Sequence, residues 1–217
     1  MHIPDGWVDL PTSAGGGAVA LAATAFSARR AARSLKERVT TLPAVVAAYV
    51  LVAQLLVIPI GYGSSAHLIG TGLAALLVGP EVTIVCVSVV VVVQALVLAD
   101  GGVTAIGLNV INDGILPALV TWWLFRLVRP LARHDKARAV LGGLAAGAGS
   151  LAAAAGVAVA FALGGTRVVP VQSVAETIGG AHLLVAVGEA VLTALALGTI
   201  LRLRPDLVVA TRSSQSG

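Results

Sequence analysis

The run VTIVCVSVVVVVQALVLA (residues 82–99) decides the fold class, because 18 consecutive residues carry no charged side chain. A helix that crosses a bilayer needs about 20 predominantly apolar residues. The rest of the chain has the same character, with a mean hydropathy of +0.98 and only 11% charged residues. Soluble domains carry about 25% charged residues. Cys86, the one cysteine, lies inside the run, which excludes disulfides and cysteine-based zinc sites. We therefore expect an all-α membrane protein.

Outward from this run, further apolar segments on both sides predict a seven-transmembrane-helix bundle. The third span is short and rich in glycine. We expect one transmembrane domain over residues 11–204, an N-terminal segment at 1–10 and a cytoplasmic tail at 205–217. Glycines four residues apart in the sixth span, Gly143 and Gly147, predict a close helix contact, within this chain as the favoured interpretation or against a partner as the alternative. The predicted spans are 11–29, 41–60, 65–80, 82–99, 103–126, 138–163 and 176–202.

The basic residues set the topology. A pI near 10.0 is also typical of nucleic-acid binding, but here the cations sit at the ends of apolar segments, next to lipid. Seven spans put all but one of the 14 Lys and Arg residues on the same side, and only Arg167 on the other. The positive-inside rule then predicts an outside N-terminus and a cytoplasmic C-terminus. The cytoplasmic set is Arg29, Arg30, Arg33, Lys36, Arg38, Arg126, Arg129, Arg133, Lys136, Arg138, Arg202, Arg204 and Arg212.

The chain begins MHIPDG (residues 1–6), and this hexapeptide predicts a metal site. The α-amino group of Met1, the backbone amide of His2 and the His2 imidazole can bind one ion in fused, nearly planar chelate rings. Planar nitrogen coordination is typical of Ni²⁺ or Cu²⁺. We expect no signal peptide, since a Pro-Asp-Gly turn stands where a cleavable leader would have its apolar region. We therefore expect Met1 to keep a free amine.

A square plane needs a fourth donor, and the His67 imidazole at the outer end of the third span is the candidate. Other polar residues at membrane depth are candidates for an outer shell, because such residues usually face a bundle interior. Asn109 and Asn112 could hold the N-terminal segment or the His67 ring, or simply join helices. His182 and Glu189 lie two turns apart on one helix face and could orient the site, move protons or join helices.

Several catalytic motifs are missing from the chain. It has no phosphate-binding loop ending in Gly-Lys-Ser/Thr and no His-Glu-x-x-His zinc motif. No Gly-x-Ser-x-Gly motif with a suitable histidine supports a hydrolase. We expect a protein that is not an enzyme, with any ATP hydrolysis carried by separate subunits.

Four motifs together resemble one family. MHIPDG at the start, SSAHLIGTGLAALLVGP at 64–80, LADGGVTAIGLNVIND at 98–113 and AHLLVAVGEAVLTAL at 181–195 are similar to the CbiM/NikM family, in the same order and over essentially the whole chain. These proteins are the nickel- or cobalt-capturing S components of energy-coupling-factor (ECF) transporters. The resemblance implies a seven-helix bundle in a bacterial or archaeal plasma membrane, with Met1, His2 and His67 binding the ion.

The resemblance also implies partners: a transmembrane coupling subunit, cytoplasmic ATPase subunits and often a small auxiliary membrane subunit. One position departs from the pattern, since Asp113 stands where the family usually has Met or another apolar residue. Asp113 therefore joins Asn109, Asn112 and His182 as possible outer-shell residues.

Three functions follow as hypotheses. The first is uptake of Ni²⁺, with Co²⁺ as the alternative substrate. The second is a membrane metal sensor that binds the ion without moving it. The third is a membrane-embedded hydrolase that uses His182 and Glu189.

Overall fold

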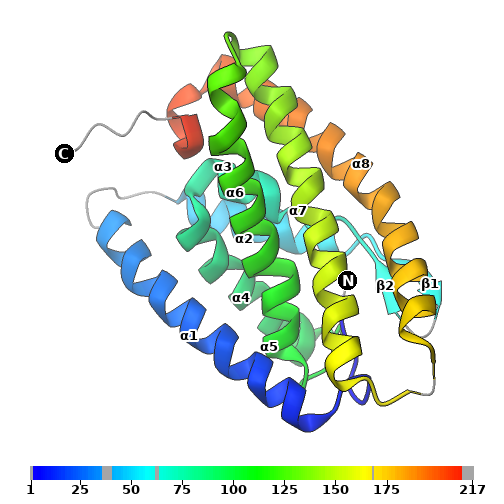
Figure 1. The fold of residues 1–217 in the computed structure, drawn as a ribbon. Helices are drawn as coiled ribbons and strands as arrows, with labels where there is room; N and C mark the ends of the chain where they lie inside the picture. Colours follow the sequence, from blue (N-terminus) through cyan, green and yellow to red (C-terminus); the bar gives the residue numbers. More distant parts are fainter. Residues whose placement is uncertain (1, 36–40, 62–63, 168, 212–217) are drawn as a thin grey trace.

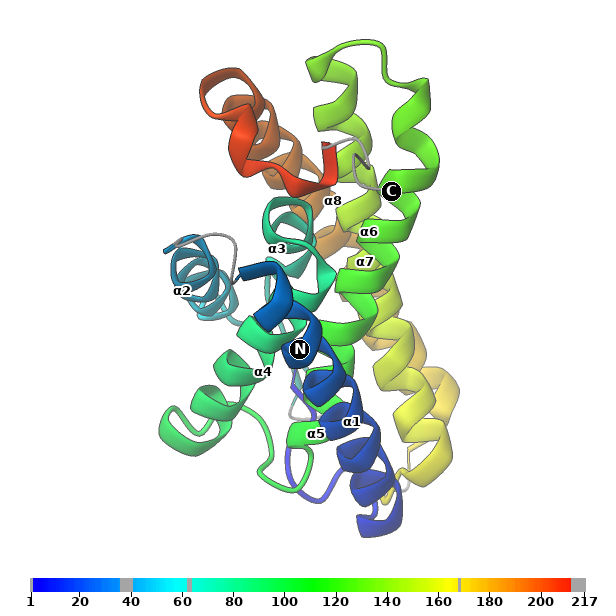
Figure 2. The same ribbon diagram turned by 90° about the vertical axis from the view of Figure 1, so that its left-hand side faces the viewer.

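The computed structural model describes residues 2–35, 41–61, 64–167 and 169–211 as a helical bundle with one short hairpin (Figure 1). Two long helices, α7 (Asp135–Gly164) and α8 (Val171–Leu203), pack against each other along the molecule. Seen after a quarter turn, α2 (Leu42–Gln54) and α4 (Pro80–Val97) lie on the opposite flank from α7 (Figure 2). The helix α1 (Leu10–Leu35) contacts α4.

Among the described residues, four helical stretches are long and apolar enough to cross a membrane: Pro80–Val97, Ile106–Leu131, Asp135–Gly164 and Val171–Leu203. This confirms the helical membrane class, but it is fewer than the seven full-length spans predicted. The apolar helix α2 has only 13 residues. Three consecutive glycines and several hydroxyl residues lower the hydropathy of α1, and arginines follow near its end.

The predicted third span, 65–80, is wrong in extent. The strands β1 (Ile58–Gly61) and β2 (Ser64–Ala66) form an antiparallel hairpin, and α3 (Thr71–Val78) has only eight residues. At 1.5 Å per residue α3 is about 12 Å long, far short of a bilayer core of about 30 Å. Glycines with positive φ bound it, Gly70 (+73°) before it and Gly79 (+86°) after it, and Pro80 then starts α4.

The predicted fifth span is a helix that changes its winding. It begins as α5 (Ile106–Asn109), loosens into a π-helical segment (Val110–Ile115) and continues as α6 (Leu116–Val128). A π-helical turn rotates the residues that follow and is frequent at functional sites. Here the wide turn carries Asn112 and Asp113, which are both buried.

Small residues bring α7 and α8 together. A Cβ atom added at Gly143 would overlap the Ala190 carbonyl, and one at Gly147 would lie 2.7 Å from the Ala186 carbonyl oxygen. The predicted glycine face therefore packs inside the chain. The larger core cluster, with Leu76, Phe125 and Leu197 among its members, is shared by α3, α6 and α8.

Candidate metal centre

The N-terminal segment, residues 2–9, packs against the bundle with both of its ends largely buried and with its central turn at Asp5 and Gly6 exposed. Ile3 and Trp7 are each only 1% exposed. The side-chain amide of Asn109 on α5 forms hydrogen bonds with both backbone polar groups of Ile3. Its Oδ1 accepts from the Ile3 N–H (2.7 Å), and its Nδ2 donates to the Ile3 carbonyl (3.2 Å). The N–H of Gly102 donates to the same carbonyl at 2.9 Å. These bonds fix the backbone one residue after His2.

The Pro4-Asp5-Gly6 turn anchors the segment to the α4–α5 loop. Gly6 has a φ of +75°, which glycine adopts without steric cost. The Asp5 carboxylate accepts hydrogen bonds from the Thr104 hydroxyl (2.6 Å), the Thr104 N–H (2.8 Å) and the Val103 N–H (3.2 Å). The bond from the Thr104 hydroxyl contributes most to lowering the pKa of Asp5 below its ordinary value.

The glycines of that loop leave room for the segment. A Cβ atom at Gly101 would lie 3.0 Å from the His2 Cβ, and one at Gly102 would overlap the Asp5 backbone nitrogen. Gly101 also has a φ of +94°. The Gly-Gly pair therefore allows two backbones to approach more closely than side chains would permit.

The second half of the segment contacts the α7–α8 connection. Val8 forms an isolated antiparallel bridge with Gly165, and the Thr166 N–H donates to the Trp7 carbonyl at 3.1 Å. The Trp7 ring meets Phe161 edge-on, with centroids 5.8 Å apart. The segment is thus held between two loops that are distant in the sequence.

His67 reaches the same place from the loop between β2 and α3. The Glu189 carboxylate on α8 accepts from the backbone N–H groups of Ile69 and Gly70, the latter at 2.7 Å. The Gln54 amide on α2 donates to the Ile69 carbonyl at 3.0 Å. Glu189 therefore holds the start of α3, a contact that the residue pattern did not reveal.

The two histidine rings come together. Their centroids are 4.9 Å apart with an interplanar angle of 32°, and the exposed fractions are 4% for His2 and 1% for His67. His67 Nδ1 lies 3.0 Å from the Leu68 carbonyl oxygen. His67 Nε2 is buried and has no hydrogen-bond partner among the described residues. Since a buried polar atom usually has a partner, this nitrogen is available to a ligand.

Two carboxylates flank the His2 ring. Asp100 Oδ1 lies 3.2 Å from His2 Nδ1, and Asp113 Oδ2 lies 3.7 Å from His2 Nε2. Asp113 is completely buried, whereas Asp100 is partly open to the surface. The contact with His2 is the main reason that the pKa of Asp100 lies below its ordinary value. Asp100 was not among the predicted site residues, although its place beside two glycines in LADGG was a usable signal.

The remaining predicted residues lie nearby in different roles. His182 is completely buried, with Nδ1 2.9 Å from the Ile178 carbonyl oxygen and no hydrogen-bond partner for Nε2 among the described residues. Asn112 forms no hydrogen bond through Nδ2 and lies instead against α7 beside Gly156. Met1 is outside the described residues.

Side chains alone do not complete a metal site here. No group of three His, Cys, Asp or Glu side chains with metal-binding geometry occurs among the described residues. Two imidazoles and two nearby carboxylates are what the bundle provides. The backbone amide of His2 is a further nitrogen beside the His2 ring, and Nε2 of His182, which has no hydrogen-bond partner in the described part of the chain, is another in the surrounding core.

Comparisons with known proteins identify the family of the chain. A family described as "Cobalt uptake substrate-specific transmembrane region" matches residues 2–207. The chain belongs to the CbiM family. A putative metal transport protein of Haloquadratum walsbyi is 37% identical to this CbiM-family chain, over 96% of the chain and 93% of that protein.

Two further relatives carry more specific descriptions. A putative fused nickel transport protein NikMN of Archaeoglobus fulgidus is 33% identical, over 96% of this chain and 68% of that protein. A crystal structure of a transition metal transporter superimposes with a TM-score of 0.80 at 25% identity, covering 93% of each chain.

Proposed function

We propose that this chain is the substrate-binding membrane subunit of an ECF-type transporter that takes up Ni²⁺ or Co²⁺. The ion is held by the Met1 amine, the His2 amide, the His2 imidazole and the His67 imidazole. The observation that carries the proposal is the meeting of the His2 and His67 rings, 65 residues apart in sequence, in a buried site with an unpartnered His67 Nε2.

The ring separation supports the proposed coordination. In a planar chelate the amine, amide and imidazole of residues 1 and 2 occupy three successive corners, so the fourth donor stands next to the His2 imidazole. With metal–nitrogen distances of about 2 Å, imidazole centroids lie about 4.5 Å apart on adjacent corners and about 6 Å apart on opposite corners. The observed 4.9 Å fits adjacent corners.

The flanking carboxylates have distinct roles in this arrangement. The chelate ring closes through His2 Nδ1, so Nε2 points away from the ion, toward Asp113. A carboxylate behind a metal-bound imidazole fixes its orientation and raises its basicity. Asp100, on the Nδ1 side and partly exposed, adds negative charge where the cation enters. Asn109 positions the segment, we assign His182 to the surroundings of the site, and we place Asn112 outside them, where it packs beside Gly156 of α7.

Nickel and cobalt are both candidate substrates. A deprotonated amide in a nitrogen plane favours nickel. The family's description names cobalt, and the Archaeoglobus fulgidus relative is described as a nickel transport protein. We rank nickel first on chemical grounds.

The arrangement of charges supports a membrane orientation with the metal site outside. The C-terminal turns of α1, α6 and α8 carry Arg33, Arg126 and Arg202, and they point toward the same end of the bundle (Figure 1). Positive residues collect on the cytoplasmic side. We therefore place the C-terminus in the cytoplasm of a bacterial or archaeal cell and the histidine pair near the outer surface.

Transport requires partners, because the chain has no nucleotide-binding motif. We propose a transmembrane coupling subunit, cytoplasmic ATPase subunits and a small auxiliary membrane subunit. Uptake of radioactive metal by the reconstituted complex, with and without ATP, separates a transporter from a sensor. ATP-independent binding with no accumulation would contradict the transport proposal.

The chelate is tested by moving the amine. One residue added before Met1 removes the amine from the ring, and we expect Ni²⁺ affinity measured by titration calorimetry to fall more than about 100-fold. Even outer-shell partners are worth about 10- to 100-fold in metal affinity. His67→Ala should have a comparable effect, and His134→Ala, in the basic loop, should have none. Unchanged affinity in the extended protein would show that the amine is not a ligand.

A further inference from the structure

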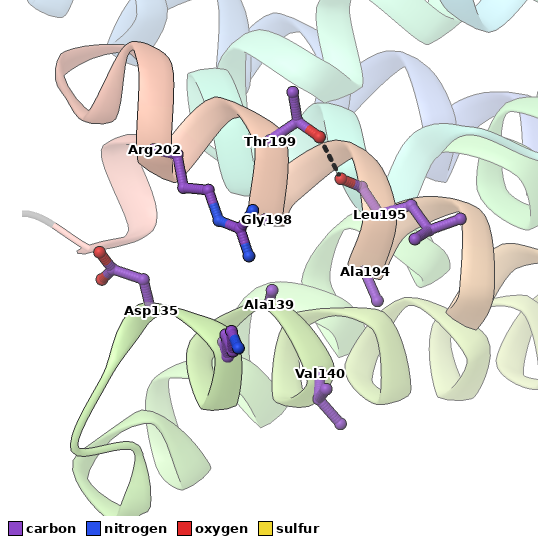
Figure 3. Close-up of a pocket in the computed structure, with 9 residues that line it drawn as sticks. Asp135, Ala139, Val140, Ala194, Leu195, Gly198, Thr199 and Arg202 are labelled. Carbon is purple, nitrogen blue, oxygen red and sulfur yellow. Dashed lines mark hydrogen bonds between the residues drawn. The ribbon is translucent and has the colours of Figure 1, made fainter.

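A pocket of about 350 Å³ opens between the first turns of α7 and the last turns of α8 (Figure 3). Lys136 and Arg202 line it together with mostly small or apolar side chains. The Arg202 side chain extends from α8 into the space facing α7, above Ala139 (Figure 3). The metal-site proposal uses none of these residues.

The two cations of this pocket have no close counter-ion in the part of the chain that the structure describes. Neither Lys136 nor Arg202 has a carboxylate within 4.0 Å among the described residues, and both are exposed. The acidic residues close by are engaged elsewhere: Asp135, which also lines the pocket, pairs with Arg138 at 3.0 Å, and Asp206 pairs with Arg204 at 2.7 Å. The N-terminus of α7 adds the positive end of a 30-residue helix.

The floor of the pocket is apolar and continues onto the lipid-facing surface. Gly198 lets the helices approach, since a Cβ there would lie 3.3 Å from the Ala139 Cβ. On either side of this seam, Val140 and Leu195 are 54% and 65% exposed. The Thr199 hydroxyl is turned to the Leu195 carbonyl, at 2.9 Å (Figure 3). The two cations match the anionic headgroup of a lipid, and the apolar groove beside them matches its acyl chain.

We infer that this pocket binds an anionic phospholipid of the adjacent leaflet, with its phosphate between Lys136 and Arg202 and an acyl chain along Val140 and Leu195. Basic pockets between membrane helices bind anionic headgroups. A free phosphate ion would leave the apolar groove uncovered. A zwitterionic lipid would bring its own cation toward two others.

The test compares lipids and variants in the full-length protein. The protein is placed in nanodiscs of phosphatidylcholine that contain increasing fractions of phosphatidylglycerol. It is then released from the nanodiscs, and the lipids that it retains are counted by native mass spectrometry. We expect retention of phosphatidylglycerol, weakened about 5-fold by Lys136→Gln or Arg202→Gln and about 30-fold by both, as each basic residue near a membrane surface is worth about 1 kcal/mol. The matched control is the double variant Arg33→Gln and Arg133→Gln, which removes the same charge at the same end but outside the pocket.

Each outcome decides the proposal. Retention lost in the pocket variant and kept in the control supports a specific lipid site. Equal loss in both would mean general surface attraction, and no preference over phosphatidylcholine would mean no anionic site; either overturns the proposal. In a third arm, inorganic phosphate is added at millimolar concentration. Displacement of the lipid by phosphate would overturn the assignment to a phospholipid. Thermal unfolding in pure phosphatidylcholine checks that both double variants are folded.

Discussion

Replacing Asn109 with alanine should weaken metal binding without unfolding the bundle. Asn109 makes two hydrogen bonds to the backbone of Ile3, and it is completely buried. If the ion is bound by residues 1 and 2, the free energy that holds Ile3 in place contributes to metal affinity. Among the described residues, the Asn109 side chain forms its hydrogen bonds with Ile3 and not with His2 or His67, so the variant tests positioning.

The magnitude follows from the two bonds. Loss of the bond to the Ile3 carbonyl costs about 1 kcal/mol, and the buried Ile3 N–H left without an acceptor costs about 1–3 kcal/mol in place of the second bond. The Ile3 carbonyl keeps its bond from Gly102, so only the Ile3 N–H loses its partner. The total is about 2–4 kcal/mol, or about 30- to 700-fold in the docking equilibrium of the first residues. The apparent metal affinity is proportional to the fraction of protein in which the segment is docked, so it falls by at most this factor.

The assay is titration calorimetry with Ni²⁺ and with Co²⁺ on detergent-purified protein. Asn112→Ala is the matched control, because Asn112 lies one turn further along and forms no hydrogen bond to the segment among the described residues. We expect the control to change affinity by less than about threefold. Equal affinities for wild type and folded Asn109→Ala, or equal losses in both variants, would refute the positioning role.

Three further predictions address other parts of the site. Gly102→Ala should displace the segment at Asp5 and abolish high-affinity metal binding. Gly179→Ala, at a glycine with open space around it, should do neither, and the protease sensitivity of the N-terminus measures the displacement. Glu189→Gln should lower the midpoint of thermal unfolding by several degrees, because an amide oxygen replaces a carboxylate at two N–H groups, yet metal should still bind; loss of binding at an unchanged midpoint would instead place this residue at the ion. The folded-state pKa of Asp5 is depressed, chiefly by the Thr104 hydroxyl, so its stabilisation is present above its ordinary value of 3.8 and is lost as the pH falls through the lower folded-state value. The stability difference between wild type and Asp5→Asn should therefore be positive at pH 7 and shrink below about pH 4, and a difference independent of pH would contradict this.

The sequence was informative wherever a property is local or compositional. Apolar runs such as 82–99 predicted helices in a membrane because their burial in lipid does not depend on their neighbours. The glycine spacing at Gly143 and Gly147 predicted a close helix contact for the same reason, since lack of a side chain is a local property. The third span failed because hydropathy does not register that Gly70 and Gly79 interrupt it with positive φ angles.

Only the tertiary structure decided which polar residues meet. The chelate at the first two residues stays a prediction, because it rests on adjacent donors of one backbone and not on the fold. The contact of His2 with His67 depends on Asn109 and on the Gly101–Gly102 loop, both of which lie more than 95 residues after His2 in the chain. The positions of Asp100 beside Nδ1 and of Glu189 at the start of α3 were likewise set by packing. Local sequence determined the helices and which donor groups the chain offers, whereas long-range backbone contacts brought the two histidines together, because a pattern in one segment carries no information about the segment that it will touch.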